Sequence, residues 1–183
     1  DQTAAEMTNS FAETAVRVWK NAAATNRVPT SEELRAAVAS MNRVHWRLDR
    51  ERSTATRLTD AAVRLNSFAK IYVVERAANA AAATPDVTGV TLNIGGDLVT
   101  RGDMNEKVSL ADPIANADNA APLARLLIAN RAVATSGNYK RGFDIAGRHY
   151  SHIIDPRTAL TAESIISATV VARNATDAGA LAT

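Results

Sequence analysis

Residues 133–158 read V-A-T-S-G-N-Y-K-R-G-F-D-I-A-G-R-H-Y-S-H-I-I-D-P-R-T, and this stretch says most about the fold. Apolar and polar residues alternate in two short runs, at 143–145 and 150–154, on either side of A-G-R at 146–148. Alternation around a glycine-containing turn predicts a β-hairpin. The second run ends in D-P-R-T at 155–158, where Asp followed by Pro favours a type I turn. We therefore expect polar side chains to gather at the end of a strand, where loops commonly carry function.

The polar residues of this stretch invite a comparison with a nucleophilic triad. Alternation along the strand places His152 and Tyr150 on one face. Ser136, His152 and Asp155 have the residue types of a serine hydrolase. The chain has no G-x-S-x-G segment, however, and T-S-G at 135–137 is typical of a tight turn, so we reject the triad.

The rest of the chain mixes helical and strand patterns. Helices are expected at 7–22, at 34–41 after a capping box from Thr30 to Glu33, at 68–83 and from 175 onward. Strands are expected at 44–48, 54–58, 87–93, 98–99, 107–110, 133–136 and 165–171, while the apolar run 123–128 is too short to assign. The elements do not alternate as βαβ units. We therefore predict an α+β fold with mostly antiparallel strands, in a single domain over residues 1–183.

The totals exclude several classes of protein. The chain has 21 basic and 19 acidic residues, a net charge of +2, and its basic residues form no block, so we expect no nucleic-acid partner. It has no cysteine, which excludes disulfides and thiolate metal sites. No apolar run is long enough for a membrane span, and residues 1–10 lack a signal-peptide pattern. Because the sequence begins and ends inside helical patterns, we expect an excerpt of a longer protein, with any leader or lipid anchor outside it.

Five short segments carry a resemblance to a known family. They are H-I-I-D-P-R-T at 152–158, T-S-G-N-Y at 135–139, N-I-G-G-D at 93–97, A-K-I-Y at 69–72 and the closing residues 175–183. Their order and spacing resemble those of the FAD:protein FMN transferases, the ApbE-like flavin transferases. The resemblance implies that FAD is the donor and that the FMN phosphoryl group passes to a threonine hydroxyl of an acceptor protein, releasing AMP. It also implies export or a lipid anchor as the family's habit.

The resemblance assigns roles to individual residues. It implies a catalytic set of His152, Asp155, Arg157 and Thr158. It implies contacts to FAD from Lys70, Tyr72, Gly95, Gly96, Asp97, Ser136 and Gly137. In this setting His152 would accept the proton of the attacking hydroxyl, since an imidazole exchanges protons near neutral pH.

Each of these residues also has a purely structural interpretation. Gly95 and Gly96 alone would suit a β-bulge, and an isolated Lys70 would be a solvated surface lysine. His152 would be a structural histidine, and the residues at 155–158 would only stiffen their turn. A non-catalytic flavin- or nucleotide-binding domain, or a hydrolase that splits FAD into FMN and AMP, therefore remains an alternative function.

The family's metal site is where this sequence departs most. The resemblance implies Mg²⁺ on the FAD diphosphate, held by the main-chain carbonyl of Ala69, by Thr183 and by an aspartate four residues before it. In this chain Gly179 replaces that aspartate. Asp177 does not stand in for it, because two residues along a helix turn the side chain by roughly 200°. Ile71 and Ala159 also replace family glycines, and we expect Ile71 to crowd its surroundings.

Overall fold

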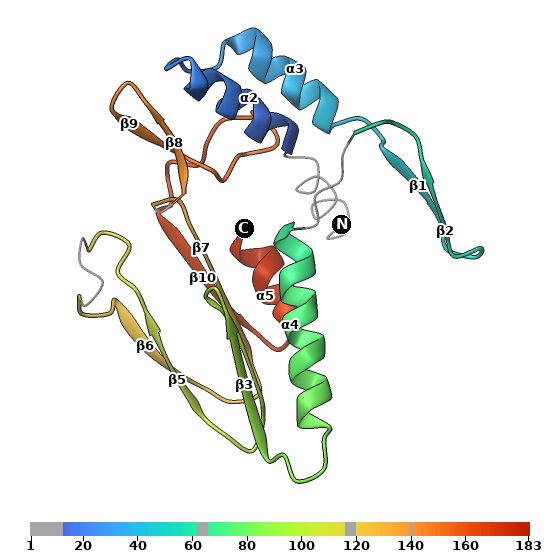
Figure 1. The fold of residues 1–183 in the computed structure, drawn as a ribbon, viewed down its shortest axis with the longest axis vertical. Coiled ribbons are helices and arrows are strands. Elements are labelled where there is room, and N and C mark those ends of the chain that lie inside the picture. The colour runs from blue at the N-terminus through green and yellow to red at the C-terminus, as the bar shows by residue number, and fades with distance from the viewer. Residues whose placement is uncertain (1–12, 62–65, 116–119, 140) are drawn as a thin grey trace. The chain divides into compact units, whose positions relative to one another are not determined.

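The computed structural model divides the chain into two compact units (Figure 1). Residues 1–65 and 141–163 form unit 1, and residues 66–140 and 164–183 form unit 2. Both units combine helices with antiparallel strands, which confirms the predicted α+β class. The structure describes residues 13–61, 66–115, 120–139 and 141–183.

Unit 1 contains two helices and two separate β-hairpins among its described residues. Its elements are α2 (Glu13–Ala24), α3 (Ser31–Met41), β1 (Trp46–Asp49), β2 (Thr54–Arg57), β8 (Gly142–Ile145) and β9 (Arg148–Ser151). β8 pairs with β9, which confirms the predicted hairpin, and β1 pairs with β2, so the strands expected at 44–48 and 54–58 form a second hairpin. The predicted helix 7–22 is confirmed from residue 13, and its first six residues lie outside the described part of the chain.

Local sequence explains how the helices of unit 1 begin and pack. Thr30 accepts a hydrogen bond from the amide of Glu33, whose side chain accepts one from the amide of Thr30, as the capping box predicts. Trp19 of α2 is buried and lies against two rings of the β8–β9 hairpin. Its centroid is 6.2 Å from that of Phe143 and 5.0 Å from that of Tyr150. Aromatic packing therefore fixes α2 to this hairpin.

Unit 2 is built on a four-stranded antiparallel sheet in the order β10-β7-β4-β3. Two further strands, β5 and β6, pair only with each other, and the apolar run 123–128 that the sequence leaves unassigned is mostly strand β6. The elements of the unit are α4 (Asn66–Ala82), β3 (Gly89–Ile94), β4 (Asp97–Gly102), β5 (Glu106–Leu110), β6 (Ala124–Ile128), β7 (Ala132–Gly137), β10 (Ser167–Ala172) and α5 (Ala175–Ala182).

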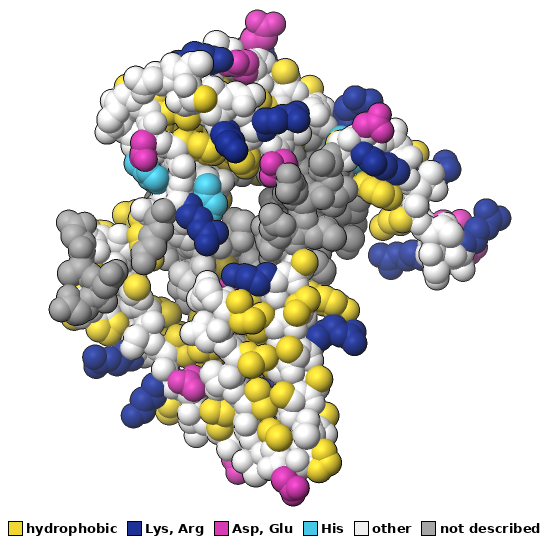
Figure 2. Space-filling model, in the orientation of Figure 1, with side chains coloured by type: hydrophobic (Ala, Val, Ile, Leu, Met, Phe, Trp, Pro, Cys, Tyr) yellow, Lys and Arg dark blue, Asp and Glu magenta, His cyan; other side chains and the backbone are white. Residues whose placement is uncertain are grey.

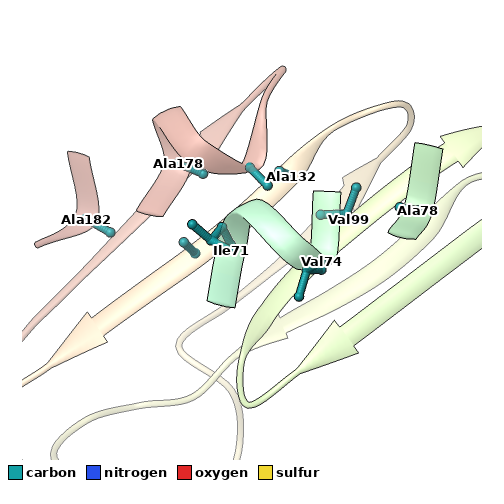
Figure 3. Packing of buried hydrophobic residues seen from close by; sticks show 9 residues of the cluster. Ile71, Val74, Ala78, Val99, Ala132, Ala178 and Ala182 are labelled. Carbon is teal, nitrogen blue, oxygen red and sulfur yellow. The ribbon is translucent and has the colours of Figure 1, made fainter. Parts of the chain in front are cut away.

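Alternation along the strands divides the core of unit 2 between two faces of the sheet. Val99 of β4 packs against α4 and α5, together with Ile71, Val74 and Ala178 (Figure 3). Leu98, its neighbour in β4, packs instead with residues of the β5–β6 hairpin. The sheet is therefore covered by the two helices on one face and by the hairpin on the other.

The helices of unit 2 also carry exposed apolar side chains. Figure 2 shows hydrophobic atoms on the outer surface of α4 and α5, where Tyr72, Val73 and Leu181 are 43%, 60% and 64% exposed. Across the described residues, no helix combines the length and the apolar character that crossing a bilayer needs.

Candidate functional site

The N-I-G-G-D segment forms the turn of the β3–β4 hairpin. Ile94 pairs with Asp97, so Gly95 and Gly96 make a two-residue turn, which replaces the bulge interpretation. Their φ angles are +58° and +90°, a conformation that suits glycine and is typical of a type I′ turn. The amide of Gly96 donates to Asn93 Oδ1 at 3.3 Å. Within the described part of the chain, and apart from the adjoining residues, no heavy atom lies within 4 Å of a Cβ added at Gly96, so the outside of the turn is open.

Lys70 lies beside this turn and pairs with its last residue. The ammonium of Lys70 forms an ion pair with Asp97. The same Nζ is 3.7 Å from the position of a Cβ added at Gly95. The Lys70 side chain is 43% exposed and that of Asp97 is 13% exposed, so the cation faces solvent above the turn. A phosphate oxygen placed there would meet the ammonium of Lys70, whose charge Asp97 partly balances, beside the two glycines of the turn.

Tyr72 lies on a different side of α4 from its buried neighbour Ile71. Its neighbour Ile71 is 1% exposed, whereas Tyr72 is 43% exposed. The guanidinium of Arg76 lies 5.7 Å from the centroid of the Tyr72 ring, and Arg76 donates to its hydroxyl at 3.2 Å. The predicted FAD-contacting tyrosine is therefore on the surface, in contact with an arginine.

The T-S-G segment and the end of α5 meet through two hydroxyl groups. Ser136 Oγ and Thr183 Oγ1 are 3.1 Å apart, and Thr183 Oγ1 donates to the carbonyl of Gly179 at 3.2 Å. A carbonyl only accepts, so Thr183 donates its single hydroxyl proton to Gly179. In the contact between the two hydroxyl groups, Ser136 is therefore the donor and Thr183 the acceptor. A Cβ added at Gly137 would lie 2.6 Å from the ring of Tyr139, so any side chain there would require that ring to move.

The residues around Gly179 do not fit the metal site that the resemblance implies. A Cβ added at Gly179 would lie 3.2 Å from Cγ2 of Ile71, so the isoleucine lies tightly against the position from which the missing carboxylate would extend. Asp177 points elsewhere and accepts from Asn174 Nδ2 at 3.3 Å. The residues that the structure describes contain no cluster of three or more His, Cys, Asp or Glu side chains. Neutral hydroxyl and carbonyl oxygens alone form a poor set for a hard dication.

His152 follows the end of strand β9 in unit 1. β9 ends at Ser151, so the predicted alternation of Tyr150 and His152 on one strand face does not reach His152. His152 Nδ1 is 3.0 Å from the carbonyl oxygen of Arg141. Because a carbonyl cannot donate, Nδ1 carries the proton in this contact, and Nε2 is the basic nitrogen of the neutral ring.

The D-P-R-T segment forms the predicted turn. The amide of Thr158 donates to the carbonyl of Asp155 at 3.2 Å. Arg157 forms a bidentate ion pair with the Asp155 carboxylate, with Nε 2.9 Å from Oδ1 and Nη2 2.6 Å from Oδ2. Ala159 keeps a φ of +58° where the family has glycine, and its carbonyl accepts from Trp19 Nε1 at 2.8 Å. The described contacts of Asp155 stiffen the turn, and the described partner of the His152 ring is the Arg141 carbonyl.

The ion pair of Asp155 with Arg157 predicts that the stability of the protein depends on pH. Hydrogen bonds from the Arg157 side chain lower the pKa of the Asp155 carboxyl below its ordinary value. The stability that the pair contributes is therefore present above the ordinary carboxyl pKa of about 3.9 and is lost as the pH falls through the lower pKa of the folded state. Arg157→Gln is expected to raise the pKa of Asp155 and to change the stability little at neutral pH, since Arg157 is exposed.

The measurement is an NMR titration of the Asp155 side-chain carboxyl carbon. Arg148→Gln is the matched control, because Arg148 pairs with Glu163 instead. The control is expected to leave the Asp155 midpoint unchanged. An unchanged midpoint in Arg157→Gln would contradict the assignment.

The sequence did not reveal the residues that hold α5 in place. Glu75 of α4 accepts hydrogen bonds from the amides of Ala175 and Thr176, at 3.1 and 3.3 Å, and from the Thr176 hydroxyl at 3.2 Å. Its other oxygen is 3.1 Å from Nη2 of Arg101. A carboxylate at a helix N-terminus satisfies free amides and favours the helix dipole. Glu75 lies four residues after Ile71 on the same helix, and this spacing is the only sequence signal for it.

Within unit 2, one group of contacts gathers Lys70 and Asp97 at the glycine turn, and a second group links Ser136 to the end of α5. Lys70 joins the start of α4 to the Gly95–Gly96 turn, and the adjacent Ile71 joins α4 to Gly179 on α5. Thr183 at the end of α5 then contacts Ser136. His152 and the turn at 155–158 belong to unit 1.

Comparison with known proteins agrees with this fold. The model of the ApbE family matches residues 4–183, and the chain therefore belongs to the ApbE family. The ApbE protein of Thermotoga maritima has a similar structure, with a TM-score of 0.82 at 26% identity, over 99% of this chain and 60% of that one.

Two curated relatives are both FAD:protein FMN transferases. That of Rhodobacter capsulatus is 35% identical over 136 residues, which are 71% of this chain and 25% of the relative. That of Klebsiella pneumoniae is 28% identical over 165 residues, which are 88% of this chain and 50% of the relative. The chain thus spans half or less of the length of these two relatives.

Proposed function

We propose that this chain is the flavin-nucleotide-binding part of a flavin transferase that moves FMN from FAD to an acceptor protein. The observation that carries the proposal is the convergence, in unit 2, of Lys70 and Asp97 on the Gly95–Gly96 turn. Membership of the ApbE family and the names of the relatives support flavin transfer as the activity. A threonine acceptor and the release of AMP are further parts of the proposal.

The proposed reaction is a single phosphoryl-group displacement. The hydroxyl oxygen of the acceptor threonine bonds to the phosphorus of the FMN half of FAD. The bond from that phosphorus to the oxygen that bridges the two phosphates breaks, and AMP leaves with the electron pair on this oxygen. The threonine proton passes to a base, and a water molecule in place of threonine would give FMN and AMP instead.

The residues of this chain would bind FAD and accept the proton. Lys70 would donate to a diphosphate oxygen beside the glycine turn, where no side chain blocks a close approach. Nε2 of His152 would take the hydroxyl proton, because the Arg141 carbonyl fixes the tautomer with the proton on Nδ1. Mg²⁺ is the cofactor that the resemblance implies, but the surroundings of Gly179 do not fit it, and we assign no step to a metal there.

The replacement of the family's aspartate by Gly179 also favours a second function. If turnover in the family needs a carboxylate at the position of Gly179, a chain with Ile71 filling that space would bind flavin nucleotides without transferring them. This flavin-binding domain would keep the Lys70–Asp97 pair and the glycine turn. It differs from the transferase only in turnover.

One assay separates these functions. The protein is incubated with FAD and a threonine-containing acceptor peptide, and free AMP and peptide-bound flavin are both measured. The transferase predicts equal amounts of AMP and flavinylated peptide, and hydrolysis predicts AMP and FMN without a labelled peptide. Bound FAD with no AMP would select the binding domain, and no FAD binding at all would contradict the proposal.

Lys70→Gln is expected to weaken FAD binding by about tenfold or more. A hydrogen bond from a charged group contributes about 1.5–3 kcal/mol, and glutamine removes the charge while keeping a polar side chain. The dissociation constant is measured from the change in flavin fluorescence. Lys107→Gln, on the separate β5–β6 hairpin, is the control and is expected to bind FAD as the wild type does. If Lys70→Gln binds FAD as tightly as Lys107→Gln does, Lys70 is not part of the FAD site.

A further inference from the structure

Two positions at which the sequence departs from its family are in contact. Ile71 on α4 replaces a glycine, and Gly179 on α5 replaces an aspartate. A Cβ added at Gly179 would lie 3.2 Å from Cγ2 and 3.4 Å from Cγ1 of Ile71. We propose that Ile71 and Gly179 form a size-matched pair, in which the branched side chain occupies the space that a side chain at position 179 needs.

Ile71 has little freedom to move away. It is 1% exposed and packs in one cluster with Val74, Ala178 and Ala182 (Figure 3). A β-branched residue in a helix has essentially one χ1 rotamer, so both of its γ carbons are held in place. Carbon atoms prefer separations of about 3.5–4.0 Å, so a Cβ at position 179 would be too close to Cγ2.

The pair also explains a glycine inside a short helix. Apart from proline, glycine is the least favourable residue in a helix interior, and Gly179 is the fifth of the eight residues of α5. The turn at Gly179 has helical geometry and needs no positive φ. Its absent side chain therefore serves packing against Ile71.

The consequence concerns cation binding. The Cβ of a carboxylate side chain introduced at position 179 alone would meet the γ carbons of Ile71, so that side chain fits only if Ile71 moves. Thr183, four residues further along the same helix, already donates to the Gly179 carbonyl. Building an oxygen site for a hard dication here thus requires two changes, a smaller residue at 71 and a carboxylate at 179.

A stability cycle tests the size match. Gly179→Ala is made in the wild type, in Ile71→Val and in Ile71→Ala, and the unfolding constant is measured in urea. Ile71→Val is the matched control because it keeps both γ carbons, whereas Ile71→Ala removes them. Gly179→Ala is expected to raise the folded-to-unfolded ratio about fivefold in the Ile71→Ala background, from helix propensity.

In the wild type and in Ile71→Val, the same change is expected to leave that ratio unchanged or to lower it. An equal gain in all three backgrounds would overturn the proposal. Where Ile71→Ala does not fold, Ile71→Leu replaces it, since leucine keeps the apolar volume and has a single γ carbon. Gly179→Ala must then be better tolerated in Ile71→Leu than in Ile71→Val.

A second measurement tests whether a dication binds near position 179. Melting temperatures are recorded against MgCl₂ concentration for Gly179→Asp alone and for Gly179→Asp combined with Ile71→Ala or Ile71→Leu. A saturable rise is expected only in the combined variants. Leu181→Asp in the same backgrounds is the control, because it adds the same charge to α5 two residues away, on another face.

Two results would overturn the proposal: a rise of equal size in Gly179→Asp alone, or no rise in any combined variant. Neither measurement uses FAD or an acceptor, so the pairing of Ile71 with Gly179 stands or falls independently of flavin transfer.

Discussion

His152→Ala is expected to lower the rate of FMN transfer by about 10²- to 10⁴-fold, the usual contribution of a positioned general base. The physical reason is the tautomer. The Arg141 carbonyl accepts the Nδ1 proton at 3.0 Å, so Nε2 is available to accept the proton of the attacking hydroxyl. The rate is measured as peptide-bound flavin per unit time at saturating FAD.

The matched control is His149→Ala in strand β9, just before His152. The ring of His149 lies 2.8 Å from Asp144 Oδ1, at the paired part of β8 and β9, and has no role in the proposed reaction. We expect the control to transfer FMN at nearly the wild-type rate. FAD affinity is expected to stay close to that of the wild type in both variants. An equal loss of transfer in the two variants would assign His152 a structural role only.

Glu75→Ala is expected to destabilise the protein by about 3 kcal/mol. Glu75 accepts three hydrogen bonds from the first turn of α5 and pairs with Arg101, and both side chains are only 15% exposed. Removing it leaves part-buried amides without an acceptor and leaves the Arg101 guanidinium with only neutral acceptors among the described residues, on Asn79, Thr100 and Arg173, which costs several kcal/mol in comparable cases. For a chain of this size the melting temperature should fall by roughly 6–12 °C.

The control is Glu163→Ala, which removes a carboxylate from an exposed pair. Glu163 lies 2.7 Å from Arg148, and the two side chains are 51% and 60% exposed. Such pairs contribute about 0–1 kcal/mol, so the melting temperature should change by only a few degrees. Similar shifts in the two variants would contradict the assignment of Glu75 as the residue that anchors α5.

Local patterns in the sequence were enough to predict several elements. The alternating runs around residues 146–148 predicted the β8–β9 hairpin, and the spacing from Thr30 to Glu33 predicted the start of α3. The turn at 155–158 followed from Asp and Pro in its first two positions. Each of these features depends on residues that are close in the chain, which is why sequence alone reveals them.

Contacts between residues that are far apart in the chain could not be predicted from the sequence. The run 123–128 forms strand β6 only because β5 pairs with it, and a short apolar run has no period of its own. The departures at Ile71 and Gly179 were visible one by one, but nothing in the sequence shows that the two residues touch. The same holds for Glu75 and the start of α5, and for the Arg141 carbonyl that orients His152.

The most direct test of the proposed flavin site is amide hydrogen exchange, measured on the wild-type protein with and without saturating FAD. Binding against the β3–β4 turn predicts slower exchange at the amides of Gly95, Gly96 and Asp97. At an FAD concentration equal to the wild-type dissociation constant, Lys70→Gln is expected to show much less of this protection than the wild type. Unchanged exchange at this turn on FAD binding, or equal protection in the wild type and Lys70→Gln at that concentration, would contradict the account.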